Sequence, residues 1–202
     1  SFDTFCQEHL PYFSLISFKY LINKKNFKIL DYRRNSINGG SINFDLSLKN
    51  SKHKPKQKKL AFLYNYEKKN NFHKLSKYEK YFNGIVKNIN KIEKSINLIS
   101  KQNKTIYCFG ASTKGNVTLQ LCNLNHKKIK GIYDVNNEKF GRHTPGTNII
   151  IKDEKNIIKD KPDYLILLIW HFKKTIEQKF KKLGLNKINI ISLFPKLSIR
   201  KK

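Results

Sequence analysis

A glycine-bounded loop, Gly110-Ala-Ser-Thr-Lys-Gly-Asn116, has residue types and a position that suit an anionic ligand. It follows a short apolar run, Thr105–Phe109, and leads into a segment with helical spacing. The N–H groups at a helix N-terminus attract phosphate, and the hydroxyls and lysine of the loop add donors. The loop lacks the middle glycine of G-x-G-x-x-G, and Lys114 precedes Gly115 where a P-loop has the reverse order. The residues predict a nucleotide or sugar-phosphate site, and a plain tight turn into a helix is the alternative.

Asp134 is a second candidate for ligand binding. It ends the next predicted strand, Ile129–Tyr133, about 20 residues beyond the loop. An acidic residue at this position accepts a hydrogen bond from a ribose hydroxyl in dinucleotide-binding folds. We therefore expect Asp134 to contact a ribose.

Adjacent Glu8 and His9 could carry acid–base chemistry. Histidine is the usual general base near neutral pH. On a strand the two side chains would face opposite ways, whereas on a loop both can reach one site. The spacing alone leaves a structural role open as the alternative.

The cysteines and the hydropathy exclude several classes of protein. The three cysteines are Cys6, Cys108 and Cys122, and they form no C-x-x-C pair and no His–Cys metal spacing. We therefore predict no metal site in this chain and a reducing, cytoplasmic location. No apolar run approaches the ~20 residues that span a bilayer, so no membrane partner is expected.

The net charge of +28 admits two interpretations. A basic nucleic-acid-binding protein is one, because clustered cations neutralise phosphates. However, lysine greatly outnumbers arginine and is spread along the whole chain, which is typical of compositional drift. Drift is favoured and nucleic acid is an unlikely partner, although nucleic-acid binding stays open as an alternative function.

The elements that precede the loop begin with a helix and a hairpin. Leu15–Ile22 has helical spacing, and Ser14 can cap it. Phe27–Leu30 and Ser41–Leu48 are predicted strands that pair antiparallel around the turn Asn35–Gly40.

Two different segments follow the hairpin. Lys49–Lys59 is rich in lysine and is predicted to be a solvated loop. Residues 74–102 are predicted to form one long amphipathic helix, because large apolar residues recur at steps of three and four. This helix is expected to bridge two halves of the chain.

From Lys104 onward, short apolar strands alternate with helical segments, which predicts an α/β domain built on a parallel sheet. The expected strands and helices are Thr105–Phe109, Ser112–Leu124, Ile129–Tyr133, Asn148–Ile151, Pro162–Ile169, Lys173–Leu183 and, as the last strand, Ile188–Ile191.

Five ordered blocks of sequence resemble one known family. The resemblance is to the S-adenosylmethionine-dependent C-methyltransferases that act on nucleotide-linked keto-deoxysugars. It covers nearly the whole chain and rests on Phe2–Leu15, Ile37–Ile42, Tyr107–Asn116, Phe140–Asn148 and Trp170–Phe172.

The resemblance implies an organisation for the chain. Residues 1–50 correspond to the antiparallel tail of a methyl-donor domain, residues 51–103 to a basic linker and the long helix, and residues 104–202 to a Rossmann-like substrate domain. The family's zinc-binding region and glycine-rich methyl-donor loop are not found in this sequence. Because the chain starts with Ser1 and contains no methionine, we expect it to be a fragment that is inactive without the upstream region. S-adenosylmethionine would be bound mainly there, and zinc only there.

The resemblance also implies roles for individual residues. His9 would be the base that removes a proton beside the sugar ketone, and Glu8 would orient it. The chain would then be the C-terminal part of a C-methyltransferase, and a non-catalytic fragment that binds nucleotide sugars is the alternative. Trp170 is either a further contact or simple core packing at a strand end. The expected substrate contacts are Cys6, Asn38, Gly39, Gly40, Gly110, Ser112, Thr113, Lys114, Asn116, Asp134, Thr147 and His171.

Overall fold

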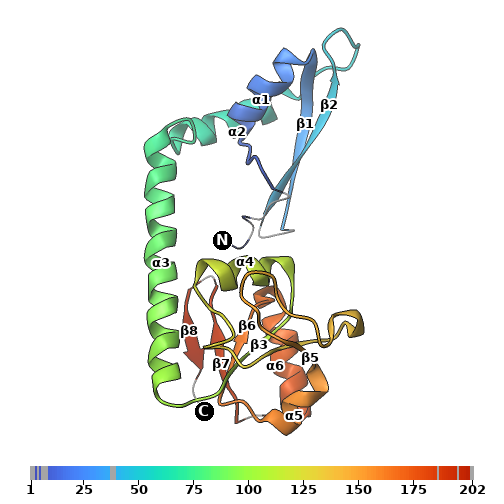
Figure 1. Cartoon of the computed structure of the whole chain (residues 1–202). Helices are drawn as coiled ribbons and strands as arrows, with labels where there is room; N and C mark the ends of the chain where they lie inside the picture. The colour runs from blue at the N-terminus through green and yellow to red at the C-terminus, as the bar shows by residue number, and fades with distance from the viewer. Residues whose placement is uncertain are drawn as a thin grey trace. The chain divides into compact units, whose positions relative to one another are not determined.

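The computed structural model describes residues 3, 5, 9–36, 40–185, 187–194 and 196–200. The chain forms two compact units: unit 1 is Ser1–Glu8 with Ile85–Lys202, and unit 2 is His9–Gly84. Figure 1 labels their helices and strands. The predicted domains 1–50, 51–103 and 104–202 stay predictions, because compact units reflect contacts within this chain and not the ancestry of its parts.

Unit 2 begins with the predicted helix and hairpin. Helix α1 (Leu15–Lys24) starts after Ser14, whose hydroxyl accepts the N–H of Ser17 at 3.2 Å while the Ser17 hydroxyl accepts the N–H of Ser14 at 2.9 Å. Strands β1 (Phe27–Asn35) and β2 (Ser41–Leu48) pair antiparallel, as predicted.

Helix α2 (Gln57–Lys69) corrects the prediction that the basic run Lys49–Lys59 is a loop throughout. The lysines at the start of α2 obscured the helical spacing of its apolar residues in the sequence. In the structure, Leu63 is buried in the small core of unit 2. The buried carboxylate of Glu67 accepts the N–H groups of the first two residues of α1, at 2.8 and 3.0 Å. Because helix N-terminal N–H groups lack partners within their own helix, this carboxylate ties α2 to α1.

Helix α3 (Leu75–Lys101) confirms the predicted long helix. Its C-terminal half belongs to unit 1, where Ile92, Ile96 and Ile99 are buried in the core. Gly84 lies within the helix and is the last residue of unit 2. A Cβ atom at Gly84 would meet no atom within 4 Å.

The sheet of unit 1 has the strand order β5-β4-β3-β6-β7-β8, and its first five strands run parallel. This confirms the predicted α/β domain with a Rossmann-like sheet. The strands are β3 (Ile106–Phe109), β4 (Ile132–Asp134), β5 (Ile151–Asp153), β6 (Tyr164–Leu167), β7 (Asn189–Ser192) and β8 (Ser198–Arg200).

Two differences between the predicted and the observed strands concern the edges of the sheet. The prediction that Ile188–Ile191 is the last strand is wrong, because β8 adds an antiparallel strand to the edge beyond β7. The strand predicted at Asn148–Ile151 begins only at Ile151. Asn148 has a φ of 53°, a left-handed conformation that ends an extended run and that asparagine tolerates better than most residues.

Helices cover both faces of the sheet (Figure 1). The C-terminal half of α3 and helix α4 (Thr113–Leu121) bury one face with residues such as Ile106 and Ile132. Helices α5 (Ile157–Asp160) and α6 (Lys173–Lys182) bury the other face with alternate strand residues. Burial on both faces explains why the strands are apolar without alternation.

Candidate functional site

The loop after β3 lies where the chain direction across the sheet reverses. From β3 the chain proceeds to β4 and β5 on one side, and then returns to β6 on the other. Ligands of open α/β sheets bind at such a switch point, outside the carboxyl ends of the strands. Gly110 has a φ of +92°, and a Cβ atom there would approach the Ile169 side chain, which follows β6, to 2.7 Å. Glycine is therefore required for the loops after β3 and β6 to pack together.

Helix α4 starts directly from this loop. The Ser112 hydroxyl accepts the N–H of Gly115 at 3.0 Å and caps the helix. A Cβ atom at Gly115 would lie 3.0 Å from Cβ of Leu168. The first turn of α4 thus packs closely on the end of β6, which fixes the direction of its N-terminus.

Ala111 has both of its backbone polar groups held by side chains. Its N–H donates to Oδ2 of Asp134 at 2.7 Å, and its carbonyl accepts from Nζ of Lys139 at 2.8 Å. Lys139 ends a short helical turn, η3 (Asn137–Lys139), after β4. Its Nζ lies 3.6 Å from Oδ2 of Asp134. The ends of β3 and β4 are therefore joined through Ala111.

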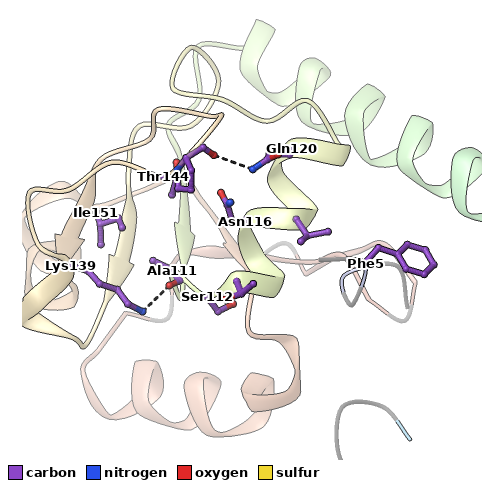
Figure 2. A pocket seen from close by; sticks show the side chains of 11 residues that line it. Phe5, Ala111, Ser112, Asn116, Gln120, Lys139, Thr144 and Ile151 are labelled. Carbon is purple, nitrogen blue, oxygen red and sulfur yellow. Dashed lines mark hydrogen bonds between the residues drawn. The ribbon is translucent and has the colours of Figure 1, made fainter. Parts of the chain in front are cut away.

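A pocket of about 600 Å³ opens beside this loop and α4 (Figure 2). The Asn116 side chain points from α4 toward the wall that contains Thr144. Its Oδ1 atom is buried and has no hydrogen-bond partner in the structure. A buried acceptor without a donor is uncommon in proteins. The pocket is lined by Phe5, Ala111, Ser112, Thr113, Asn116, Val117, Gln120, Lys139, Thr144, Pro145 and Ile151.

The opposite wall of the pocket comes from the Phe140–Asn148 block. Nε2 of Gln120 donates to the carbonyl of Pro145 at 3.1 Å, which connects α4 to this wall. The buried hydroxyls of Thr144 and Thr147 lie 2.6 Å apart. Thr144 lines the pocket. Thr147, the residue predicted from sequence, is not part of the lining and contacts Thr144 through this hydrogen bond.

Trp170 and His171 lie at the other side of the switch point, in the turn η5 (Trp170–Phe172) after β6. Their rings stack with centroids 3.6 Å apart. The Trp170 indole N–H donates to the buried carboxylate of Asp3 at 2.9 Å. Partial burial lowers the pKa of His171, the nearby Lys114 lowers it further, and Asp3 opposes the shift.

The remaining predicted residues belong to unit 2 or lie outside the described residues. The His9 side chain is exposed and meets Tyr12 edge to face, with ring centroids 6.5 Å apart. Gly40 has a φ of +123°, as expected for a glycine turn. Cys6, Glu8, Asn38 and Gly39 lie outside the described residues.

The structure brings several predicted residues of unit 1 to one place. Gly110, Ser112, Thr113 and Asn116 form the loop and the α4 side of the pocket, and Asp134 is bonded to that loop. Sequence reasoning did not single out Phe5, Gln120, Lys139 and Thr144. Phe5 and Thr144 lie in the blocks Phe2–Leu15 and Phe140–Asn148 and could have been found from them. Lys139 has no signal in its own segment, because its partner Ala111 follows a different strand. The binding roles of all these residues stay predictions.

Two features are absent from the described part of the chain, a metal-binding cluster and a membrane-spanning helix. No group of three or more His, Cys, Asp or Glu side chains among them could hold a metal ion. Within the same residues, no helix combines the length and the apolarity needed to cross a membrane.

Comparisons with known proteins identify the family of the chain. A family model described as the C-methyltransferase C-terminal domain matches residues 36–195. The chain is 27% identical over 171 residues to C-methyltransferase NovU of Streptomyces niveus, a match that covers 85% of this chain and 40% of NovU. The chain thus spans about two fifths of the length of this curated relative. Because the family model covers most of its residues, the chain belongs to the C-methyltransferase C-terminal domain family.

Proposed function

We propose that this chain holds the substrate in a C-methyltransferase that moves a methyl group from S-adenosylmethionine to a carbon beside the ketone of a nucleotide-linked keto-deoxysugar. Family membership and the similarity to C-methyltransferase NovU support the reaction class. The pocket beside Gly110–Asn116 supports the assignment of this part of the protein to substrate binding.

The electrostatics of the pocket carry the proposal. Lys139 is the only charged side chain among the described residues that line it, and the N-terminus of α4 adds the positive end of a helix dipole. Both favour a diphosphate, and the buried Oδ1 of Asn116 offers an acceptor to a polar group of the same ligand. A nucleoside diphosphate sugar matches this combination of positive charge and hydrogen-bonding groups.

The same pocket does not fit the methyl donor. S-adenosylmethionine carries a sulfonium and an ammonium cation beside one carboxylate, and its net positive charge is disfavoured next to Lys139 and the positive end of the α4 dipole. The carboxylate of Asp134 contacts the loop, but it is already bonded to Ala111 and close to Lys139. We therefore place the nucleotide sugar in this pocket and the donor elsewhere in the complete methyltransferase.

His9 is the proposed base of the reaction. It would take the proton from the carbon next to the ketone, and Glu8 would orient the imidazole ring. Support comes from the Glu-His pair itself and from the exposure of the His9 side chain, which leaves the ring accessible to a substrate. S-adenosylmethionine would supply the methyl group for this carbon.

Calorimetric titration of the 202-residue chain with a nucleoside diphosphate sugar tests the binding step. We expect binding that weakens about tenfold in Lys139→Met, because one charge-assisted contact is lost. Lys155→Met, on the next strand connection, is the matched control and leaves the affinity unchanged. Absence of binding by the unchanged chain rules out the proposed role of the pocket.

A chimera tests the reaction. The part of NovU outside its match is fused to this chain and is incubated with S-adenosylmethionine and a nucleotide-linked 4-keto-6-deoxyhexose. We expect a product heavier by one CH₂ group, and the loss of at least a hundredfold of the rate in His9→Asn. Turnover that persists in His9→Asn excludes His9 as the base, and binding without any turnover supports the alternative of a non-catalytic binding fragment.

A further inference from the structure

Ala111 occupies a critical position in the loop Gly110–Asn116. It lies between Gly110, whose positive φ turns the chain, and Ser112, which caps α4. Any rotation of the peptide units around Ala111 changes the direction in which the first N–H groups of α4 point. The loop therefore needs a restraint at Ala111 if it is to hold an anion in one place.

Asp134 supplies one half of such a restraint. Its Oδ2 accepts the N–H of Ala111 at 2.7 Å, and its Oδ1 accepts the N–H of Asn136 at 2.9 Å. The residue is 7% exposed. Both oxygens thus bind backbone groups, one in the loop after β3 and one in the turn after β4. This arrangement differs from a ribose acceptor, whose oxygens are presented to the ligand.

Lys139 supplies the other half. Its Nζ donates to the carbonyl of Ala111 at 2.8 Å and lies 3.6 Å from Oδ2 of Asp134. Without this cation, a carboxylate would stand beside a pocket that takes an anion, and would repel it. Lys139 therefore compensates the charge of Asp134 and also lines the pocket.

We propose that Asp134 and Lys139 are positioning residues that clamp Ala111 and so preorganise the N-terminus of α4 for the phosphate groups of the substrate. Asp134 acts through the loop and not through a ribose hydroxyl. The identity of the ligand rests on the proposed function, whereas the clamp itself is a property of the free chain.

Amide hydrogen exchange measured by NMR tests the clamp without a ligand. In Asp134→Ala, the Ala111 amide loses its acceptor and exchanges at least about tenfold faster. The Gly110 amide, which donates to the carbonyl of Tyr133 at 2.8 Å, is the internal control and keeps its rate. Asp153→Ala is the matched variant, because Asp153 ends β5 and binds the N–H of Lys155 at 2.9 Å in the same way. Unchanged protection of Ala111 in Asp134→Ala overturns the clamp.

Titration with three anions separates positioning from ribose binding. We expect Asp134→Ala to lose about tenfold in affinity for uridine diphosphate, its 2′-deoxy counterpart and inorganic pyrophosphate alike. A loss confined to the ribose-containing ligand assigns Asp134 to the ribose, and unchanged or tighter binding of pyrophosphate overturns the clamp. Should Asp134→Ala fail to fold, Asp134→Asn, which keeps the size of the side chain, is expected to speed exchange of the Ala111 amide and to weaken binding of all three ligands. Unchanged exchange at Ala111 in that variant overturns the proposal.

Discussion

At the level of residues, a change at Asn116 should affect ligand binding without lowering stability, because its Oδ1 atom has no partner in the structure. The atom is buried on the wall of the pocket and makes no hydrogen bond in the structure. We expect Asn116→Leu to leave the free energy of unfolding unchanged or to raise it by up to about 1 kcal/mol, because no existing bond is lost and leucine favours helices. The same change should weaken binding of a nucleoside diphosphate sugar about tenfold.

Thermal unfolding and calorimetric titration measure the two effects on one variant. Asn90→Leu on α3 is the control, since Asn90 is an exposed helical asparagine outside the pocket. It should reproduce the change in stability without the loss of affinity. A large loss of stability in Asn116→Leu with unchanged affinity would assign Asn116 to the fold alone.

The candidate residues differ in how far sequence could predict them. Gly110 and Ser112 belong to one short loop between a strand and a helix, so local pattern was enough to place them together. Lys139 was missed because its partner Ala111 is distant in sequence and meets it only through the parallel pairing of β3 with β4. Asp134 was found by position, but the sequence could not show that both of its oxygens bind backbone N–H groups.

At the level of elements, two glycines in helices have opposite expected effects when they are replaced. Gly115→Ala places a Cβ atom 3.0 Å from Leu168 and should lower the free energy of unfolding by about 1 kcal/mol, since overpacking outweighs the gain in helix propensity. Gly84→Ala meets no atom within 4 Å and should raise it by about 0.5–1 kcal/mol. Urea unfolding followed by circular dichroism gives both values. Equal effects at the two sites would contradict the close packing of α4 on β6.

The stabilising contact between β1 and α2 should weaken at low pH. Nζ of Lys56 and Nζ of Lys59 each lie 2.7 Å from Asp31, and their hydrogen bonds hold the pKa of Asp31 well below its ordinary value of 3.8. Because the pKa is lowered on folding, the stabilisation is present above 3.8 and is lost as the pH falls below it. We expect Asp31→Asn to be less stable than the unchanged chain at neutral pH, and the difference in urea midpoint to narrow from about pH 5 to about pH 3.

Asp45→Asn is the control for this pH dependence. Asp45 pairs with Arg33 at 2.8 Å on the exposed side of the hairpin, where ion pairs contribute only about 0–1 kcal/mol. Its urea midpoint should stay close to that of the unchanged chain. A difference in urea midpoint between Asp31→Asn and the unchanged chain that is the same at every pH would show that the lysines do not stabilise the contact between β1 and α2 through charge.

At the level of the whole molecule, the parallel part of the sheet was predictable and its edges were not. Strands buried on both faces form apolar runs, such as Tyr164–Leu167, and helices separate them regularly. By contrast, β8 (Ser198–Arg200) is too short to have a pattern, and only its pairing with β7 defines it. Helix α2 was missed in part because lysine dominates its start, while Leu63 and Glu67 acquire their roles from α1 and β1.

Gly84 also affects how the chain loses structure. Helix propagation passes from each residue to the next, and a glycine weakens it at one point. On the C-terminal side, burial of Ile92, Ile96 and Ile99 retains the helix as long as the core of unit 1 is intact. On the N-terminal side, no such core residue of α3 is buried among the described positions 75–84. We therefore expect the turns of α3 before Gly84 to lose their helical structure before the turns that follow it.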